Sequence, residues 1–98
     1  MSFDEFVLSL DNNYPPDSIR DLAVAVWHDY KGDWKRARNI AQSVATADGA
    51  WVHAYLHRKY GDIWNSDYWY SRAGRQRPDL SLEDERENII NTILMSEN

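Results

Sequence analysis

Apolar side chains recur every three to four residues in six stretches of the chain, and short polar breaks separate these stretches. This spacing places the apolar residues of each stretch on one face of a helix. No stretch alternates apolar and polar residues over the length of a strand. The pattern therefore predicts an all-α domain of about five or six helices. We expect them over residues 2–10, 17–31, 34–45, 51–60, 63–73 and 81–95.

Two Gly-Asp pairs mark the tightest of the predicted turns. Gly32 and Gly61 each follow an expected helix, where a glycine can adopt the left-handed conformation that ends it. Asp33 and Asp62 then provide the side-chain oxygen that caps the next helix. We expect a positive φ at both glycines. The single domain 1–98 divides into an N-terminal helix and loop (1–14), a first hairpin (17–45), a second hairpin (48–77) and a C-terminal helix (80–98).

Part of the chain aligns with itself at an offset of 29 residues. Each copy is a helix, a Gly-Asp turn and a second helix. This is the pattern of stacked helical hairpins, none of which can bury its apolar face alone. The alternative is a chance similarity between two amphipathic hairpins. The segment Ala25-x-x-His28-x-x-x-Gly32-Asp33-Trp34 corresponds to Ala54-x-x-His57-x-x-x-Gly61-Asp62-Ile63.

Residues 18–78 resemble tetratricopeptide repeats, in which a similar turn is followed by a small residue and an apolar stripe. The Tyr68-Trp69-Tyr70 segment, followed by Arg72-Ala73-Gly74, is also similar to Sel1-like repeats. Residues 48–70 further resemble a group of small proteins known from genome sequences, which implies no activity. The tetratricopeptide resemblance implies stacked antiparallel hairpins between N- and C-terminal capping helices. It also implies a concave groove for a protein or peptide, lined by the first helix of each hairpin: Leu22, Val26, Asp29, Tyr30, Trp51, Tyr55, Arg58 and Lys59.

Charge is unevenly distributed along the chain. The formal net charge is -5, which disfavours nucleic acid and anionic membranes as partners. Residues 1–30 and 78–98 each carry a net charge of -5, whereas residues 31–77 carry +5. Arg58 and Lys59 in the expected groove therefore favour an acidic or carboxylate-bearing peptide. With no signal-like leader and no apolar run of membrane-spanning length, we expect a cytoplasmic protein.

Histidines are the only group that suggests a metal site, because the chain has no cysteine. His53 and His57 are four residues apart and share a face of one expected helix. Together they could hold a metal ion, with a third ligand from His28 or Asp29. The alternative is a set of half-buried histidines bonded to neighbouring residues, in which burial lowers their pKa values.

An aromatic and basic stretch runs from Tyr55 to Arg77. Its rings could belong to the core, to a protein interface or to a nucleic-acid site. The acidic residues Glu83 to Glu87 lie in the first turns of the last helix, where we expect them to be solvated. No serine nucleophile motif or phosphate-binding loop is present.

The sequence therefore favours a small protein-interaction module without a cofactor, and argues against an enzyme. Self-association stays open. The alternative function is a metal- or small-molecule-binding domain, or an enzyme, built on the three histidines.

Overall fold

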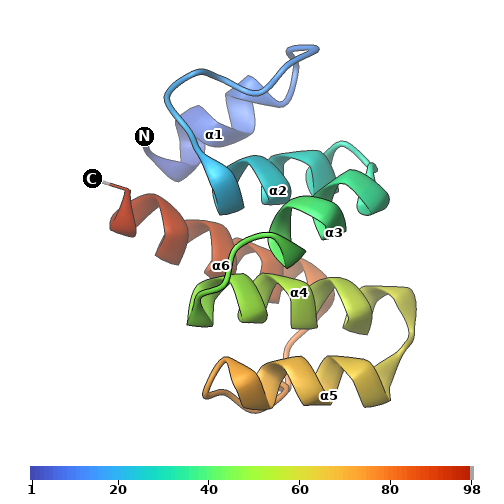
Figure 1. Ribbon diagram of the computed structural model, residues 1–98. Coiled ribbons are helices and arrows are strands. Elements are labelled where there is room, and N and C mark those ends of the chain that lie inside the picture. The colour runs from blue at the N-terminus through green and yellow to red at the C-terminus, as the bar shows by residue number, and fades with distance from the viewer. Residues whose placement is uncertain (98) are drawn as a thin grey trace.

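The computed structural model describes residues 1–97, and this part of the chain contains six helices and no strand. It therefore confirms the all-α class and the expected number of helices. The helices are α1 (Phe3–Ser9), α2 (Asp21–Tyr30), α3 (Trp34–Gln42), α4 (Ala47–Tyr60), α5 (Ile63–Arg72) and α6 (Leu82–Ser96) (Figure 1).

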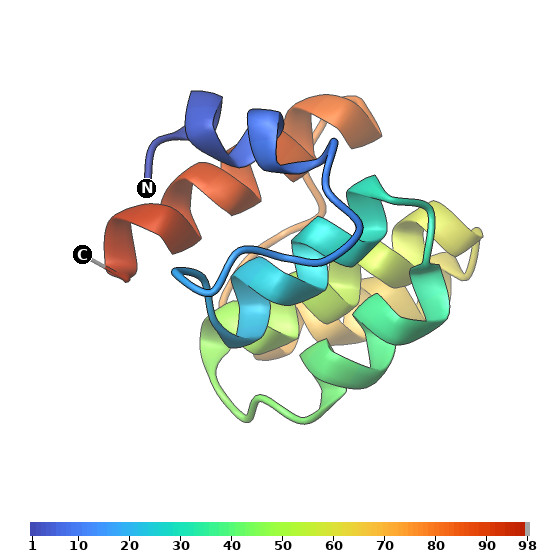
Figure 2. The same ribbon diagram turned by 90° about the horizontal axis from the view of Figure 1, so that it is seen from above.

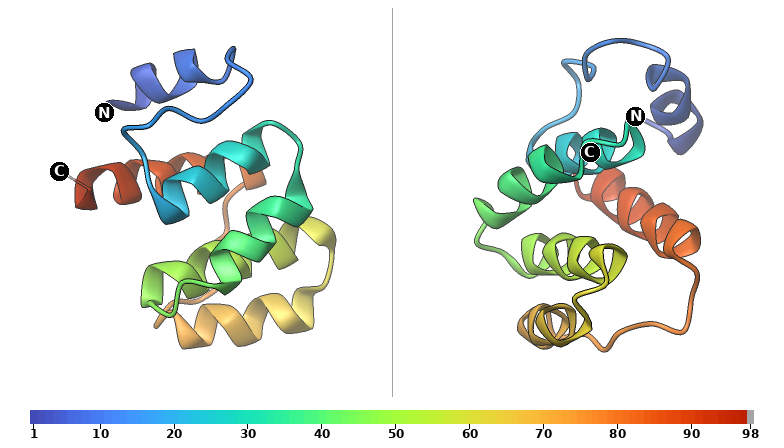
Figure 3. Two further views of the ribbon diagram at one scale, coloured as in Figure 1. Left: turned by 45° about the horizontal axis from the view of Figure 1, so that its top comes forward. Right: turned by 90° about the vertical axis from the view of Figure 1, so that its right-hand side faces the viewer.

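Helices α2 to α5 follow one another in space as they do in sequence, each packed against the next. Helix α6 returns along the side of this series and packs against both α2 and α4, as the right-hand view of Figure 3 shows. Helix α1 lies next to α6 at the far end from α5 (Figures 1 and 2). Helix α5 thus forms one end of the molecule, and α4 is the one helix on which it packs closely within residues 1–97.

This arrangement does not show tetratricopeptide or Sel1-like repeats. The offset between the two Gly-Asp turns is 29 residues, against about 34 for a tetratricopeptide repeat. Helix α6 also lies along α2 and α4, the two helices whose surfaces the resemblance assigns to an open groove.

Both Gly-Asp turns have the geometry that the sequence predicts. The φ angles are 86° at Gly32 and 97° at Gly61, which confirms the left-handed helix ends. Asp33 and Asp62 each cap the next helix by accepting a hydrogen bond from the N–H three residues later. Each aspartate also donates its own N–H to the carbonyl five residues earlier, at 2.9 and 3.0 Å. The two turns are therefore alike in both conformation and hydrogen bonding.

Two helices begin at places that the pattern did not predict. Helix α2 starts four residues later than expected, because residues 16–19 form a turn in which the N–H of Ile19 donates to the Pro16 carbonyl at 3.3 Å. Helix α4 starts four residues earlier, because the Thr46 hydroxyl caps it by accepting from the N–H of Gly49. A Cβ at Gly49 would lie 2.1 Å from the Val44 carbonyl oxygen, so only glycine permits this tight entry.

All six helices contribute to one hydrophobic core. Its largest fully buried side chains include Trp27, Tyr55 and Tyr70. Alanines on α2, α3 and α4 allow these helices to approach closely. The indole N–H of Trp27 donates to the Ser9 hydroxyl at 3.2 Å, which links α1 to α2.

Candidate functional sites

The first candidate site is a set of charged and aromatic side chains around the buried carboxylate of Asp29. Asp29 is only 2% exposed, and it accepts hydrogen bonds from the Tyr55 hydroxyl at 2.8 Å and the Lys59 ammonium at 2.9 Å. Arg86 of α6 lies 3.5 Å from the same carboxylate and 3.7 Å from the ring centroid of Tyr30. Burial, reinforced by the neighbouring Asp29, raises the pKa of Tyr55, so its hydroxyl stays a donor.

A second buried carboxylate, Glu85 of α6, lies against α4 and α5. Glu85 is 1% exposed and accepts a hydrogen bond from Arg58 at 2.8 Å. The Tyr70 hydroxyl donates to it at 2.5 and 2.7 Å, and the Trp51 indole N–H donates at 3.2 Å. The guanidinium of Arg75 stacks on the Trp51 ring, 3.5 Å from its centroid.

The structure therefore brings the predicted groove residues together, but beneath α6. Asp29, Tyr55 and Trp51 are buried, and Arg58 and Lys59 are engaged in ion pairs. Lys59 keeps an exposed side chain, but a partner would reach the three buried residues only after α6 had moved away from α2 and α4.

Sequence reasoning missed the two α6 residues that complete these networks. Glu85 was expected to be solvated with the other acids of the first turns, but it is buried. A usable signal was present, because Glu85 lies four residues before Ile89 and so shares the apolar face of α6. Arg86 also stands out in the sequence, because it is the one base among the six acids of residues 78–98.

The three histidines do not form one cluster. His53 and His57 meet, with their Nε2 atoms 2.9 Å apart, and the Trp69 ring stacks on His53 at a centroid distance of 4.2 Å. His28 instead packs edge-on against Trp27. Within residues 1–97, no three side chains of the His, Cys, Asp and Glu types are grouped so that they could hold a metal ion.

Burial favours the uncharged form of all three histidines. Burial is the main cause that lowers the pKa of His53 to about 4, and the charges of His57 and Arg38 act in the same direction. Burial also lowers the pKa values of His57 and His28. The structure thus supports the alternative of enclosed histidines.

The outer face of α5 is the main exposed aromatic surface. Trp64 is 79% exposed and Tyr68 is 47% exposed. With Arg72, whose guanidinium lies 5.8 Å from the Tyr68 ring centroid, they follow one another at intervals of four residues and share this face. The aromatic and basic stretch is therefore divided between core and surface: Tyr55 and Tyr70 are buried, whereas Trp64 and Tyr68 are exposed.

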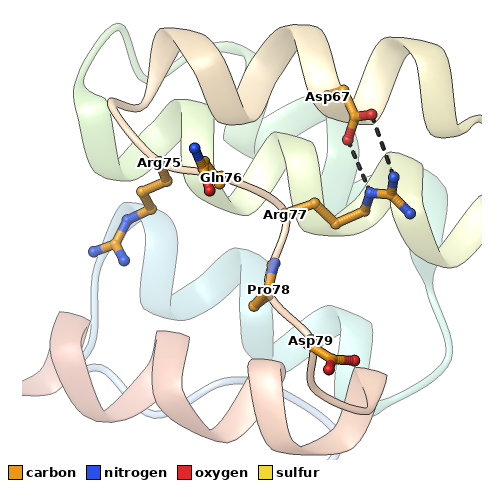
Figure 4. A pocket seen from close by; sticks show the side chains of 6 residues that line it. All are labelled: Asp67, Arg75, Gln76, Arg77, Pro78 and Asp79. Carbon is orange, nitrogen blue, oxygen red and sulfur yellow. Dashed lines mark hydrogen bonds and ion pairs between the residues drawn. The ribbon is translucent and has the colours of Figure 1, made fainter.

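The loop that follows α5 carries two further basic residues, Arg75 and Arg77. It borders an open hollow of about 470 Å³, lined by Arg75 to Asp79 and by Asp67 of α5 (Figure 4). Arg77 pairs with Asp67 at 3.0 Å, whereas Arg75 points to the opposite side of the loop (Figure 4). Neither Arg72 nor Arg75 forms an ion pair with another residue in the described part of the chain.

Comparison of the chain with protein-family models, curated proteins and solved structures finds no match. The function is therefore inferred from the side chains described above. Among residues 1–97, no helix combines the length and the apolar character that a membrane crossing requires.

Proposed function

We propose that the chain is a protein-interaction module that binds an acidic protein or peptide segment through the outer face of α5. The observation that carries this proposal is the exposure of Trp64 beside Tyr68 and Arg72. Large aromatic side chains are usually withdrawn from water. Tryptophan, tyrosine and arginine are also the residue types that contribute most to binding energy in protein interfaces.

The charge of the surface favours an acidic partner. Arg72 has no ion-pair partner within residues 1–97, so its guanidinium can donate hydrogen bonds to a carboxylate of another molecule. An arginine presents its N–H groups in a planar fork that matches the two oxygens of a carboxylate. Complementary charge increases both specificity and the rate of association.

We also propose that α2–α3 and α4–α5 are two copies of one helical-hairpin unit, stacked antiparallel. The matching conformations of the two Gly-Asp turns support this duplication. In proteins built from such units each unit packs on its neighbours, and a terminal unit needs a polar outer face to stay soluble. Trp64 and Tyr68 depart from that expectation on α5, the helix at one end of the molecule, which favours a binding role for this face.

The proposal is tested by selecting random displayed peptides on the immobilised protein. We expect acidic sequences, and we expect Trp64→Ala and Arg72→Glu to weaken their binding by roughly 30-fold or more. Met95→Ala is the matched control, because Met95 is an equally exposed apolar residue on α6. Equal binding by all three variants, each with an unchanged melting temperature, would refute the proposal. Size-exclusion chromatography of the same proteins shows whether a second copy of the chain occupies this face.

A further inference from the structure

A cavity of about 340 Å³ lies where the end of α3, the start of α4 and the end of α5 meet. The start of α4 and the end of α5 lie side by side at the left of Figure 1. The cavity exists because most of its lining is short: Ala41, Ala47, Gly49 and Ala50 provide its walls. Its volume falls in the range of small-molecule sites, about 300–1,000 Å³.

We propose that this cavity binds a small carboxylate with a compact apolar body, held by Arg72 and by Nδ1 of His53. Both residues line the cavity together with Trp69. Trp69 forms one wall, with the His53 ring stacked on it and the Arg72 guanidinium 5.3 Å from its centroid. This site is separate from the acidic-segment surface proposed above, although Arg72 borders both.

His53 is the polar lining residue with a ring nitrogen available to a ligand. Its side chain is only 5% exposed, and the one hydrogen bond that it forms within residues 1–97 uses Nε2. Its Nδ1 has no partner in the described part of the chain and, unlike Nδ1 of His57, is not fully enclosed, so a molecule in the cavity can reach it. Thr46 is occupied because it caps α4, and Gln42 because it accepts a hydrogen bond from Arg38. Arg72 donates one of its five N–H groups to the Tyr68 hydroxyl at 3.1 Å, which leaves others for a ligand.

The contact between the two histidines determines which nitrogen of His53 carries its proton. One of the two Nε2 atoms must donate to the other across their 2.9 Å separation. The Nδ1 atom of His57 is buried without a partner, and an unpaired buried N–H is rarer than an unpaired acceptor. We therefore place the proton of His57 on Nε2, from which it donates to His53. The proton of His53 then lies on Nδ1, which makes this atom a hydrogen-bond donor toward a ligand.

These groups select an anion over a neutral or cationic ligand. Arg72 offers the planar fork that suits a carboxylate, and His53 adds one uncharged donor. Arg38, whose charge lowers the pKa of His53, adds positive potential nearby. The alanines and the Trp69 ring favour an apolar body on the same molecule.

The site is tested by NMR titration of the 15N-labelled protein with benzoate and with isobutyrate. Benzamide and inorganic phosphate are the comparison ligands, because one lacks the charge and the other lacks the apolar body. We expect a saturable shift of the Gly49 amide and the Trp69 indole resonances with the carboxylates. The comparison ligands should bind at least roughly tenfold more weakly, as expected for the loss of a hydrogen bond to a charged group.

Variants show whether the carboxylate occupies this cavity. Ala50→Leu should fill it and abolish the shifts, and His53→Phe should weaken binding while retaining a ring against Trp69. Arg72→Gln should weaken binding at least roughly tenfold. Arg77→Gln is the matched control, because Arg77 lies outside the cavity lining.

No saturable shift, or equal binding by Ala50→Leu and by the parent protein, would overturn the site. The acidic-segment proposal is separable from it, because Trp64→Ala should not change carboxylate binding and Ala50→Leu should not change peptide binding.

Discussion

Replacing Glu85 by alanine should destabilise the protein by about 3–5 kcal/mol, as expected when one partner of a buried ion pair is removed. The structure explains the size of this effect. The Arg58 guanidinium, the Tyr70 hydroxyl and the Trp51 indole N–H all donate to the Glu85 carboxylate. Tyr70 and Trp51 are buried, so water cannot replace the lost acceptor. Each buried donor left unpaired costs about 1–3 kcal/mol.

The loss is large relative to the total stability of a domain of this size, about 5–15 kcal/mol. It corresponds to a fall in melting temperature of at least about 12 °C. Glu85→Gln should lie between the parent and the alanine variant, because the amide keeps one acceptor oxygen but turns an N–H₂ group toward the donors. Glu87→Ala is the matched control, since Glu87 is an exposed acid of the same helix. It should change stability by less than about 0.5 kcal/mol.

The assay is urea unfolding of the four proteins, followed by circular dichroism at pH 7. The expected order of stability is parent and Glu87→Ala together, then Glu85→Gln, then Glu85→Ala. If Glu85→Ala were as stable as Glu87→Ala, α6 would not be held by a buried carboxylate, and the placement of Glu85 between Arg58 and Tyr70 would be wrong.

Two further predictions concern groups elsewhere in the fold. Because the pKa of His53 is lowered to about 4 in the folded state, the unfolded chain takes up a proton first as the pH falls below about 6.5. The free energy of unfolding should therefore fall by about 2 kcal/mol between pH 7 and pH 5. Urea unfolding of His53→Phe should show a smaller fall over the same range. An equal fall in both proteins would contradict the enclosure of His53. Gly49→Ala places a Cβ 2.1 Å from the Val44 carbonyl oxygen and should lower the free energy of unfolding by about 1–3 kcal/mol. An unchanged melting temperature would show that the backbone at the start of α4 can relax.

Local pattern was sufficient to predict the six helices and the two Gly-Asp turns, but not the residues at which α2 and α4 begin. Gly32 and Gly61 end their helices in the left-handed conformation because each needs only its own sequence context to do so. The pairing of His53 with His57 also follows from their spacing on one helix. These features depend on residues within one or two turns of each other.

Features that depend on distant residues were missed. An acid in the first turn of a helix is usually solvated, and only the spacing of four residues from Ile89 distinguishes Glu85 from Glu87. Arg86 and Asp29 are 57 positions apart, and the spacing of apolar residues cannot predict a contact between residues so far apart in the sequence. The groove was expected to be open for the same reason, because its covering helix comes from the far end of the chain. The start of α4 was misplaced because a glycine usually indicates a break in a helix. Gly49 is instead needed inside the first turn of α4, where the Val44 carbonyl leaves no room for a Cβ.

The position of α6 also sets the order in which the fold can be completed during synthesis. Helix α6 emerges from the ribosome after the other five helices, yet it carries the carboxylate that Arg58, Tyr70 and Trp51 all require. Until residue 85 has emerged, the nascent α4–α5 pair holds a cation and two donors that face an empty position. Helices of a small bundle usually form and dock through local contacts, which makes them fast. We therefore expect the packing of the first five helices to be completed only when α6 docks, and the nascent chain to be open to chaperones and proteases until then.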